Sequence, residues 1–335
     1  MALLTDISVL LTNIVGSIIL LLFFPILSFI NYRKKKTNFP TPKAVVITGA
    51  SSGIGRGIAL EYAKRKKTTD SLVLGLTGRN IQKLQELKNE CLKLGVNVEI
   101  ESIDVTDKEK LNDWLISFDN KYKIDVLIAN AGTMETMLPK EMEFSERMLT
   151  IANTNVIGTL NTVLPMIPIF ETRRSGQIVL MSSITPFCDY VMAGYTASKG
   201  FIKSFGLTLR NGVAPRGVGV SVLAPGFIYT PLVDSLEYEK IGGLLPITTD
   251  DASKYIIDGI SRNDALISFP PISYFVSHFI STIPPNLKDG FNFISNLILK
   301  YPDYSKPLSL LSSKDDFSSP SIVSSSPIAN KQKEA

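Results

Sequence analysis

The stretch KAVVITGASSGIG (43–55) joins an apolar run to a turn with glycines at positions 49, 53 and 55. An amphipathic stretch of helical length, IGRGIALEYAKRKK (54–67), follows at once. Glycine allows a backbone to approach a pyrophosphate closely, and the free N–H groups of a helix N-terminus attract an anion. A glycine-rich turn between a strand and a helix therefore predicts a phosphate-binding loop. Its candidate residues are Gly49, Ser51, Ser52, Gly53, Ile54 and Gly55.

The same strand-and-helix rhythm continues along the chain. Runs rich in Val, Ile and Leu recur at 43–48, 71–77, 96–103, 123–129, 176–182 and 217–223, with a shorter one at 265–270. Amphipathic stretches lie between them, for example at 54–67, 80–95, 107–122 and about 249–262. Continuous apolar strands that alternate with helices are typical of a parallel sheet covered on both faces. We therefore expect an α/β fold with a doubly wound parallel sheet, of the Rossmann type.

Composition excludes several classes of protein. The chain has 335 residues and a net charge of +4, without the broad basic face of a nucleic-acid-binding protein. Its cysteines, Cys91 and Cys188, are far apart, and its single histidine is His278. A disulfide framework, a metal site and a Ser-His-Asp triad are therefore not expected.

The N-terminus has the pattern of a membrane anchor. No charged residue occurs from Ile7 to Ile30, a stretch long enough for the roughly 20 residues that span a bilayer. Asp6 precedes this stretch and the basic run Arg33–Lys36 follows it, which is the reverse of a cleaved signal peptide. The positive-inside rule then places all that follows in the cytosol. The predicted fold class thus includes an N-terminal transmembrane helix.

The predicted organisation has five parts along the chain. They are an anchor with its basic flank (1–36), a linker (37–42), a nucleotide-binding catalytic domain (43–270), an apolar extension (271–304) and a Ser-rich tail (305–335). The tail has too few large apolar residues to form a core, so we expect it to be disordered.

Five motifs, in order, resemble the short-chain dehydrogenase/reductase superfamily over roughly residues 43–270. They are TGASSGIG (48–55), NAG (130–132), NVIG (155–158), a Ser pair followed by YTASK (195–199), and PGFIYT (225–230). The resemblance implies a single-domain Rossmann oxidoreductase. It also implies that Tyr195, Lys199, a serine and Asn155 are catalytic. Asn130, Gly132, Tyr195, Lys199, Pro225, Gly226, Ile228 and Thr230 are the residues that it implies for cofactor binding.

Two departures from the family pattern concern the site. Ala129 stands where the family often has a second asparagine before NAG. The catalytic serine usually lies 13 residues before the tyrosine, which here is Ser182, whereas its place in the Ser-Ser pair points to Ser183. The sequence leaves both serines as candidates.

The end of the second strand indicates which nicotinamide cofactor is bound. An NAD site usually has an acidic residue there, which bonds the ribose 2′-OH. Here Gly78 stands at that position and Arg79 follows it. Because a guanidinium suits a 2′-phosphate, the sequence predicts NADP(H). Asp104 matches the family position that bonds the adenine ring.

The predicted chemistry is proton transfer by Tyr195 coupled to hydride transfer. Residues four apart lie on one helical face, so Lys199 can lie beneath Tyr195. We expect its ammonium, together with the oxidised nicotinamide, to lower the pKa of the tyrosine. The serine would polarise the carbonyl oxygen, Asn155 would position a water, and Ile228 and Thr230 would hold the carboxamide.

A predicted anchor suggests a lipophilic ketone or aldehyde, or the corresponding alcohol, as substrate. The loop 227–250 would close the pocket, and the apolar segment 269–287 is too short to span a bilayer, so it would lie at the interface or pack on the domain. Lys331 and Lys333 resemble an endoplasmic-reticulum retrieval signal, and the resemblance implies a possible homodimer. The alternatives are a catalytically silent NADP(H)-binding membrane protein and, more narrowly, a 3-ketosphinganine-type reductase.

Overall fold

We describe a computed structural model of the chain. It describes residues 5–16, 39–66, 71–187, 192–234 and 246–289. The predicted tail (305–335) lies outside the described residues.

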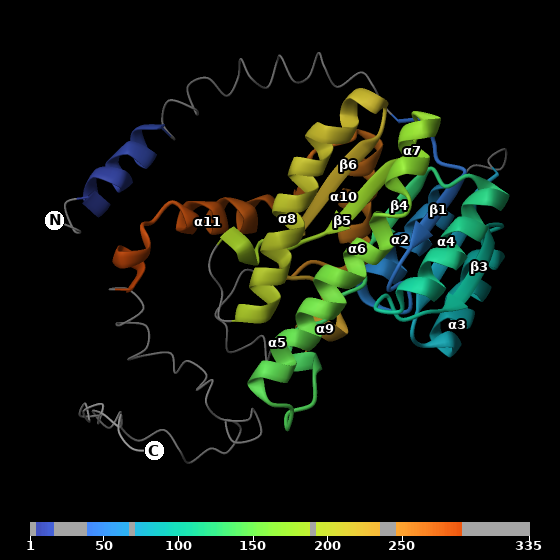
Figure 1. The fold of residues 1–335 in the computed structure, drawn as a ribbon, viewed down its shortest axis with the longest axis horizontal. Helices are drawn as coiled ribbons and strands as arrows, with labels where there is room; N and C mark the ends of the chain where they lie inside the picture. Colours follow the sequence, from blue (N-terminus) through green and yellow to red (C-terminus); the bar gives the residue numbers. More distant parts are fainter. Residues whose placement is uncertain (1–4, 17–38, 67–70, 188–191, 235–245, 290–335) are drawn as a thin grey trace, which may run out of the picture.

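A seven-stranded sheet in the order β3-β2-β1-β4-β5-β6-β7 forms the centre of the domain (Figure 1). Every neighbouring pair of these strands is parallel. The strands are β1 (Ala44–Ile47), β2 (Val73–Gly78), β3 (Asn97–Ser102), β4 (Val126–Ala129), β5 (Gln177–Met181), β6 (Gly219–Pro225) and β7 (Leu266–Phe269). The predicted doubly wound parallel sheet is thus confirmed, with a strand in each of the apolar runs named above.

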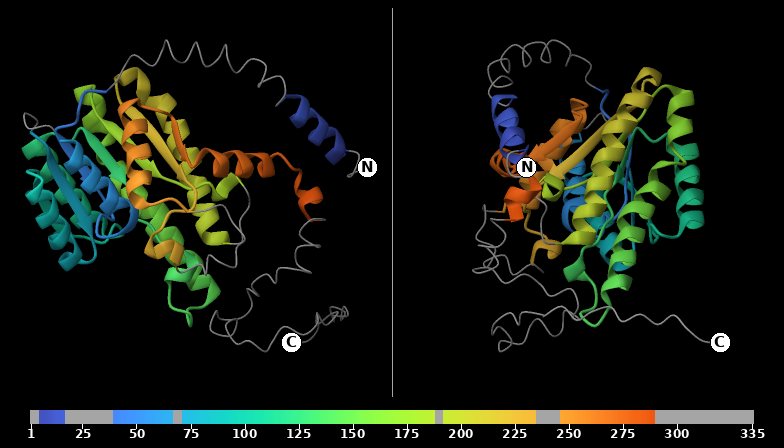
Figure 2. Two further views of the ribbon diagram at one scale, coloured as in Figure 1. Left: turned by 180° about the vertical axis from the view of Figure 1, so that it is seen from behind. Right: turned by 60° about the vertical axis from the view of Figure 1, so that its left-hand side comes forward.

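Helices cover both faces of the sheet, as the two views of Figure 2 show. On one face α2 (Gly53–Arg65), α3 (Ile81–Lys93) and α10 (Thr249–Ser261) pack on alternate strand residues such as Val45 and Ile47. The opposite face packs on the intervening residues, such as Val46 and Leu127. Its helices are α4 (Lys108–Tyr122), α5 (Phe144–Ala152), α6 (Gly158–Val163), α7 (Ile167–Arg173) and α8 (Ala193–Val213). This alternation follows from the period of two in a strand, which sends successive side chains to opposite faces.

The strand order reverses at β1, which has β2 on one side and β4 on the other. In such sheets ligands bind in the crevice outside the carboxyl ends of the strands at this switch point. The short elements η1 (Glu135–Met137), η2 (Asn153–Ile157, a π-helical turn) and η3 (Thr185–Phe187) follow or adjoin those ends. The same holds for α9 (Pro231–Asp234), whereas η4 (Ala214–Arg216) joins α8 to β6.

Only part of the predicted anchor belongs to the described residues. Residues 5–16 are helical, and the remainder of the predicted span lies outside them. Among the described helices none is both long and apolar enough to cross a membrane. The segment 269–287 forms α11 (Pro271–Ser281), which extends away from the sheet in Figures 1 and 2. The Asn13 side chain donates a 3.1 Å hydrogen bond to the Thr282 carbonyl, so helix 5–16 lies beside the end of α11.

Candidate active site

The glycine loop connects β1 to α2 at the switch point, and its backbone needs glycine. Gly49 has a φ of +66°, and a Cβ there would lie 2.7 Å from the Ala131 Cα. A Cβ on Gly55 would lie 2.5 Å from Nδ2 of Asn130. Asn130 in turn donates from Nδ2 to the carbonyls of Thr48 (2.9 Å) and Gly49 (3.2 Å). Asn130 therefore holds the glycine loop in place through two hydrogen bonds. The sequence predicts a cofactor-binding residue at this position.

The first turn of α2 differs from that of its neighbours. The N-terminal amides of α3, α4 and α10 are capped by the side chains of Asn80, Asp107 and Thr248. Ser52 occupies the same position before α2, but its side chain makes no capping bond, and the first turn has no acidic residue. Uncapped amides next to a glycine turn fit the pyrophosphate of a dinucleotide.

The residues predicted to recognise the adenosine half lie around the end of β2. Gly78 is the last residue of β2, and a Cβ on it would lie 3.1 Å from Oγ of Ser51. The next residue, Arg79, is exposed. Asp104 accepts hydrogen bonds from the backbone N–H and the hydroxyl of Thr106 through one oxygen. A hydroxyl and a guanidinium thus stand at the end of β2, where an NAD site would usually have a carboxylate.

Tyr195 and Lys199 lie in the first two turns of α8. Lys199 is 3% exposed, and its Nζ lies 5.6 Å from the centre of the Tyr195 ring. The ammonium donates a 2.8 Å hydrogen bond to the carbonyl of Met181, the last residue of β5. A Cβ on Gly132 would come within 3.2 Å of the same Nζ, so the glycine of NAG leaves room for the lysine. The predicted pair therefore lies on one helical face, next to the carboxyl ends of β4 and β5.

The pKa values at this pair are set mainly by burial. Burial raises the pKa of Tyr195 to about 12, a hydrogen bond with the Ser183 hydroxyl lowers it, and the Glu135 carboxylate raises it. Burial lowers the pKa of Lys199 to about 8. Without cofactor, the pKa of Tyr195 thus lies above that of free tyrosine, and the lowering expected from the ammonium together with the oxidised nicotinamide stays a prediction. The reason is that loss of hydration disfavours the phenolate more than the surrounding donors favour it.

The two candidate serines have different surroundings. The Ser182 hydroxyl donates a 2.7 Å hydrogen bond to the carbonyl of Lys199, so it ties β5 to α8. The Ser183 hydroxyl instead forms the hydrogen bond with the Tyr195 side chain, and it also accepts one from the Thr185 N–H at 3.2 Å. Consecutive residues of an extended segment point in opposite directions. Only Ser183 therefore faces the tyrosine.

Asn155 lies in the π-helical turn and is fully buried. Its Oδ1 accepts a 2.8 Å hydrogen bond from the Thr133 N–H. Its Nδ2 donates at 2.9 Å to both the Thr133 carbonyl and the Ser198 hydroxyl, and that hydroxyl donates to the Tyr195 carbonyl. The side chain thus joins the loop after β4 to α8. The predicted role in positioning a water stays a prediction.

Glu135 is a site residue that the sequence reasoning missed. Its Oε1 accepts hydrogen bonds from the backbone N–H groups of Gly194 (2.8 Å) and Tyr195 (3.2 Å). The position before α8 is Met192, which cannot cap a helix, and a carboxylate from a distant loop takes that role. The presence of Met192 at this position was the one local signal that the cap must come from elsewhere.

The motif after β6 completes the rim of the site. Pro225 ends β6, and the Gly226 N–H donates to the Phe269 carbonyl at 2.8 Å. Ile228 pairs with Ile247 in an isolated parallel bridge. A Cβ on Gly53 would lie 3.4 Å from Cγ2 of Thr230. PGFIYT therefore lies against the glycine loop, although residues 235–245 of the predicted pocket loop lie outside the described residues.

Comparisons with known proteins agree with this geometry. A family model described as short chain dehydrogenase matches residues 43–240. An uncharacterized oxidoreductase of Myxococcus xanthus is 33% identical over 232 residues, which cover 68% of this chain and 87% of that protein. The Arabidopsis thaliana protein named 11-beta-hydroxysteroid dehydrogenase-like 2 is 31% identical over 261 residues, covering 75% of this chain and 82% of that protein.

A solved structure has the same fold. The closed form of a serine dehydrogenase complexed with NADP+ is 26% identical and has a TM-score of 0.59, covering 69% of this chain and 95% of that chain. The family match, the parallel sheet and the site geometry lead to one assignment. The chain belongs to the short chain dehydrogenase family and is an NAD(P)-dependent oxidoreductase with a Rossmann fold.

Proposed function

We propose that the protein is an NADPH-dependent carbonyl reductase in which Tyr195 is the proton donor. The observation that carries this proposal is the contact of the Tyr195 side chain with the Ser183 hydroxyl, beside the buried ammonium of Lys199. Bound NADPH would supply the hydride to the carbonyl carbon. Tyr195 would supply the proton to the oxygen, which gives an alcohol.

The chain's own groups can serve the reduction step. With a pKa of about 12, Tyr195 holds its proton at neutral pH and can act as a general acid. The Ser183 hydroxyl can donate to the substrate oxygen as negative charge develops there. After proton transfer, the Lys199 ammonium would stabilise the phenolate until solvent returns the proton. Ser183 would thus stabilise the negative charge on the substrate oxygen, and Lys199 the negative charge on Tyr195.

Turnover by the full-length chain tests this proposal. NADPH oxidation would be followed with a panel of lipophilic ketones and aldehydes, alongside Tyr195→Phe and a separate measurement of NADPH binding. We expect reduction of at least one compound by the wild type alone. If both proteins bind NADPH and neither reduces a carbonyl, the catalytically silent alternative is correct.

The preference for NADPH over NADH rests on Arg79 and Ser51, which border Gly78 at the end of β2. A charged hydrogen bond contributes about 1.5–3 kcal/mol. We therefore expect Arg79→Gln to raise the KM for NADPH about tenfold or more and to leave the KM for NADH nearly unchanged. The nearby surface change Lys83→Gln is the control. Equal effects of Arg79→Gln on the two cofactors would refute the assignment.

A lipophilic substrate and a membrane location are supported by α11. Ser273 and Ser277 face the domain, whereas Ile272, Phe275 and Phe279 are each more than half exposed. A helix with an outward apolar face fits the interfacial region of a bilayer. With the predicted anchor, this favours a protein of the endoplasmic reticulum whose catalytic domain is cytosolic, acting on long-chain ketones such as a 3-ketosphinganine.

Two measurements test the membrane proposal. Carbonate extraction and protease treatment of intact microsomes should leave the chain in the membrane and its catalytic domain accessible. The double change Phe275→Glu and Phe279→Glu should raise the KM for a long-chain ketone presented in vesicles, but not for a short soluble ketone. Leu92→Glu, at an exposed residue of α3, is the matched control. Release of the full chain by carbonate would contradict the anchor.

A homodimer is supported by the exposed apolar residues Leu149 on α5, Ile157 in the π-helical turn and Phe201 on α8. These elements adjoin one another on one side of the domain. Sedimentation of the full chain should give twice the monomer mass, and Leu149→Glu should shift it to the monomer. A wild-type monomer would rule the dimer out.

A further inference from the structure

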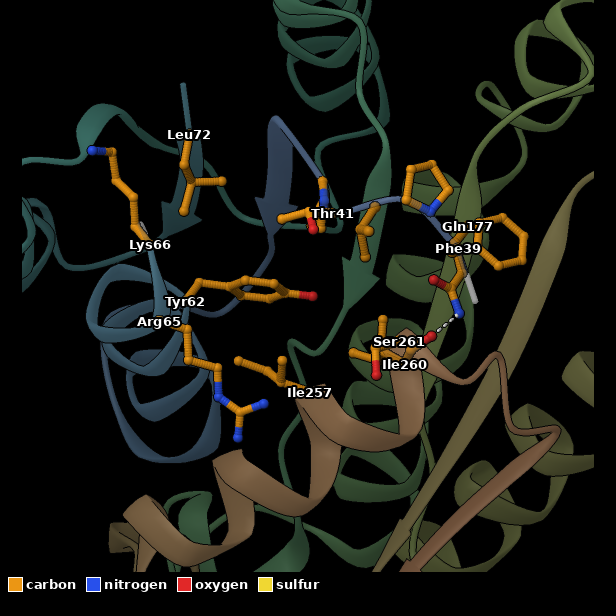
Figure 3. Close-up of a pocket in the computed structure, with 13 residues that line it drawn as sticks. Phe39, Thr41, Tyr62, Arg65, Lys66, Leu72, Gln177, Ile257, Ile260 and Ser261 are labelled. Carbon is orange, nitrogen blue, oxygen red and sulfur yellow. Dashed lines mark hydrogen bonds between the residues drawn. The ribbon is translucent and has the colours of Figure 1, made fainter. Parts of the chain in front are cut away.

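A cavity of about 160 Å³ lies at the amino edge of the sheet, opposite the candidate active site (Figure 3). Its base includes Val126 and Gln177, the first residues of β4 and β5. The end of α2, the end of α10 and the linker residues 39–42 form its walls. The cavity is separate from Tyr195 and Lys199, which lie near the carboxyl ends of the same strands.

Two buried polar atoms of the cavity have no hydrogen-bond partner, the Tyr62 hydroxyl and Oε1 of Gln177. Tyr62 is 5% exposed and Gln177 is 1% exposed. In Figure 3 the Tyr62 ring extends across the cavity, and the Gln177 oxygen is turned towards the tyrosine. Because a buried polar atom without a partner is costly, each of these atoms calls for a partner from outside the chain, either a water or a ligand.

The orientation of Gln177 is set by its other end. Its Nε2 donates to the Ile260 carbonyl at 2.9 Å and to the Ser221 hydroxyl at 3.3 Å. An amide oxygen could not occupy the position next to the Ile260 carbonyl, since both are acceptors. The acceptor oxygen of Gln177 therefore faces the cavity. Burial raises the pKa of Tyr62, so its hydroxyl stays protonated and can donate.

The remaining wall includes the hydroxyls of Thr41 and Ser261, is otherwise mostly apolar, and brings no free charge inward. Phe39, Leu72 and Ile257 supply hydrocarbon surface. Arg65 is bound to Glu61 and Asp258. The Nζ of Lys66 lies 4.0 Å from a Cβ placed on Gly95, outside the cavity, and Figure 3 shows it pointing away. The wall therefore suits a neutral ligand.

We propose that this cavity binds a small neutral alcohol or phenol. The ligand hydroxyl accepts a hydrogen bond from the Tyr62 hydroxyl and donates one to Oε1 of Gln177. A hydroxyl meets both needs at once, whereas an ether lacks the donor. The hydrocarbon part packs on Phe39, Leu72 and Ile257. The volume suits a single aromatic ring, because an apolar cavity of about 150 Å³ holds benzene. Occupancy joins the linker to α2 and α10 and stabilises the domain.

Phenol and toluene, which differ in the hydroxyl, are the probes for this site. Their binding to the full-length chain would be measured by calorimetry and by the rise in Tm. We expect phenol to bind about tenfold more tightly than toluene, the factor that one hydrogen bond of about 1.4 kcal/mol supplies. Tyr62→Phe should reduce that difference by weakening phenol alone, because the bond to Gln177 remains. Tyr255→Phe, at an exposed tyrosine of α10 outside the cavity, should keep it.

A crystal structure of the wild type soaked with phenol gives a result that depends on no substitution. Phenol density between Tyr62 and Gln177 supports the proposal. Ordered waters alone on these two groups, or equal affinity for phenol and toluene, overturns it. Neither result bears on Tyr195, so the proposed reductase activity stands or falls separately.

Discussion

Within the described residues, two pairs with the spacing Tyr-x-x-x-Lys lie at opposite edges of the sheet, YAKRK (62–66) and YTASK (195–199). Lys199 lies within α8 and is buried next to the Tyr195 ring. Lys66 is the residue after the last one of α2, and its Nζ lies near Gly95 and points away from Tyr62 in Figure 3. The spacing thus brings a lysine to its tyrosine only where both residues lie inside a helix.

The two tyrosines also differ in what surrounds their hydroxyls. Burial raises the pKa of both. A hydrogen bond with Ser183 and the charge of Glu135 then act on Tyr195, whereas the positive charge of Arg65 acts on Tyr62, which has no hydrogen-bond partner. Tyr195 is a candidate acid because the Ser183 hydroxyl beside it can bind the same substrate oxygen. Tyr62 has no such neighbouring hydroxyl bonded to it.

The largest expected effect is at the tyrosines themselves. Tyr195→Phe removes the proposed acid, and kcat/KM for carbonyl reduction should fall about 10³-fold. The matched change Tyr62→Phe removes a buried hydroxyl without a partner, and should raise the free energy of unfolding by up to about 1 kcal/mol. Steady-state kinetics measure the change in kcat/KM of both variants, and urea unfolding measures their free energy of unfolding. Equal losses of activity would remove the distinction between the pairs.

The serines give the next largest effect. Ser183→Ala should lower kcat about 10²-fold, the loss typical of one oxyanion donor. Ser182→Ala breaks the bond to the Lys199 carbonyl and should instead cost about 1 kcal/mol of stability. Kinetics and chemical unfolding of the two variants separate these roles. The reverse pattern would make Ser182 the catalytic serine.

At the lysines the expected effect is on stability. The pKa of Lys199 falls from 10.5 to about 8 on folding, which is about 3 kcal/mol at 1.36 kcal/mol per unit. Lys199→Met removes this cost but also loses the hydrogen bond to the Met181 carbonyl, which contributes about 1 kcal/mol. The variant should therefore stabilise the cofactor-free chain by about 2 kcal/mol at pH 7.

The pH dependence of that gain has a definite sign. Below pH 8 both the folded and the unfolded state hold the proton, so the folded state bears the full cost of the buried charge. Between pH 8 and 10.5 the folded state releases it first, and wild-type stability rises relative to Lys199→Met. Unfolding at several pH values measures the gap, with Lys66→Met as control. If the stability difference between Lys199→Met and the wild type grew with pH, Lys199 would not be a buried, charged lysine in the folded state.

The smallest effect is expected at the charges near the tyrosines. Glu135→Gln keeps an oxygen for the N–H groups of Gly194 and Tyr195 but removes the charge. The pKa of Tyr195 should fall, and stability should drop by about 0.5 kcal/mol as α8 loses a negative charge at its N-terminus. Spectrophotometric titration of tyrosine, with Glu143→Gln as control, detects the shift. A rise in the pKa would show that Glu135 does not act through its charge.

Local patterns were enough for most of the fold and part of the site. The strands follow from apolar runs, and the glycine loop from a turn that admits no Cβ at Gly49 or Gly55. The choice of Ser183 could not be read locally, because a count of residues and a place in a pair gave different answers. Glu135 could not be found either, since its partners lie about 60 residues further on. Whether the anchor spans a bilayer stays a prediction, because most of it lies outside the described residues.

The sequence by itself determined the places of the strands and helices along the chain, the phosphate-binding turn and the helical spacing of Tyr195 and Lys199. These depend on periodicity and backbone freedom over a few neighbouring residues. Only the tertiary structure decided which lysine lies against its tyrosine, which serine meets Tyr195, and that the pKa of Tyr195 rises to about 12. Burial and charge are sums over groups far apart in the chain, which only the packed sheet and its helices bring together.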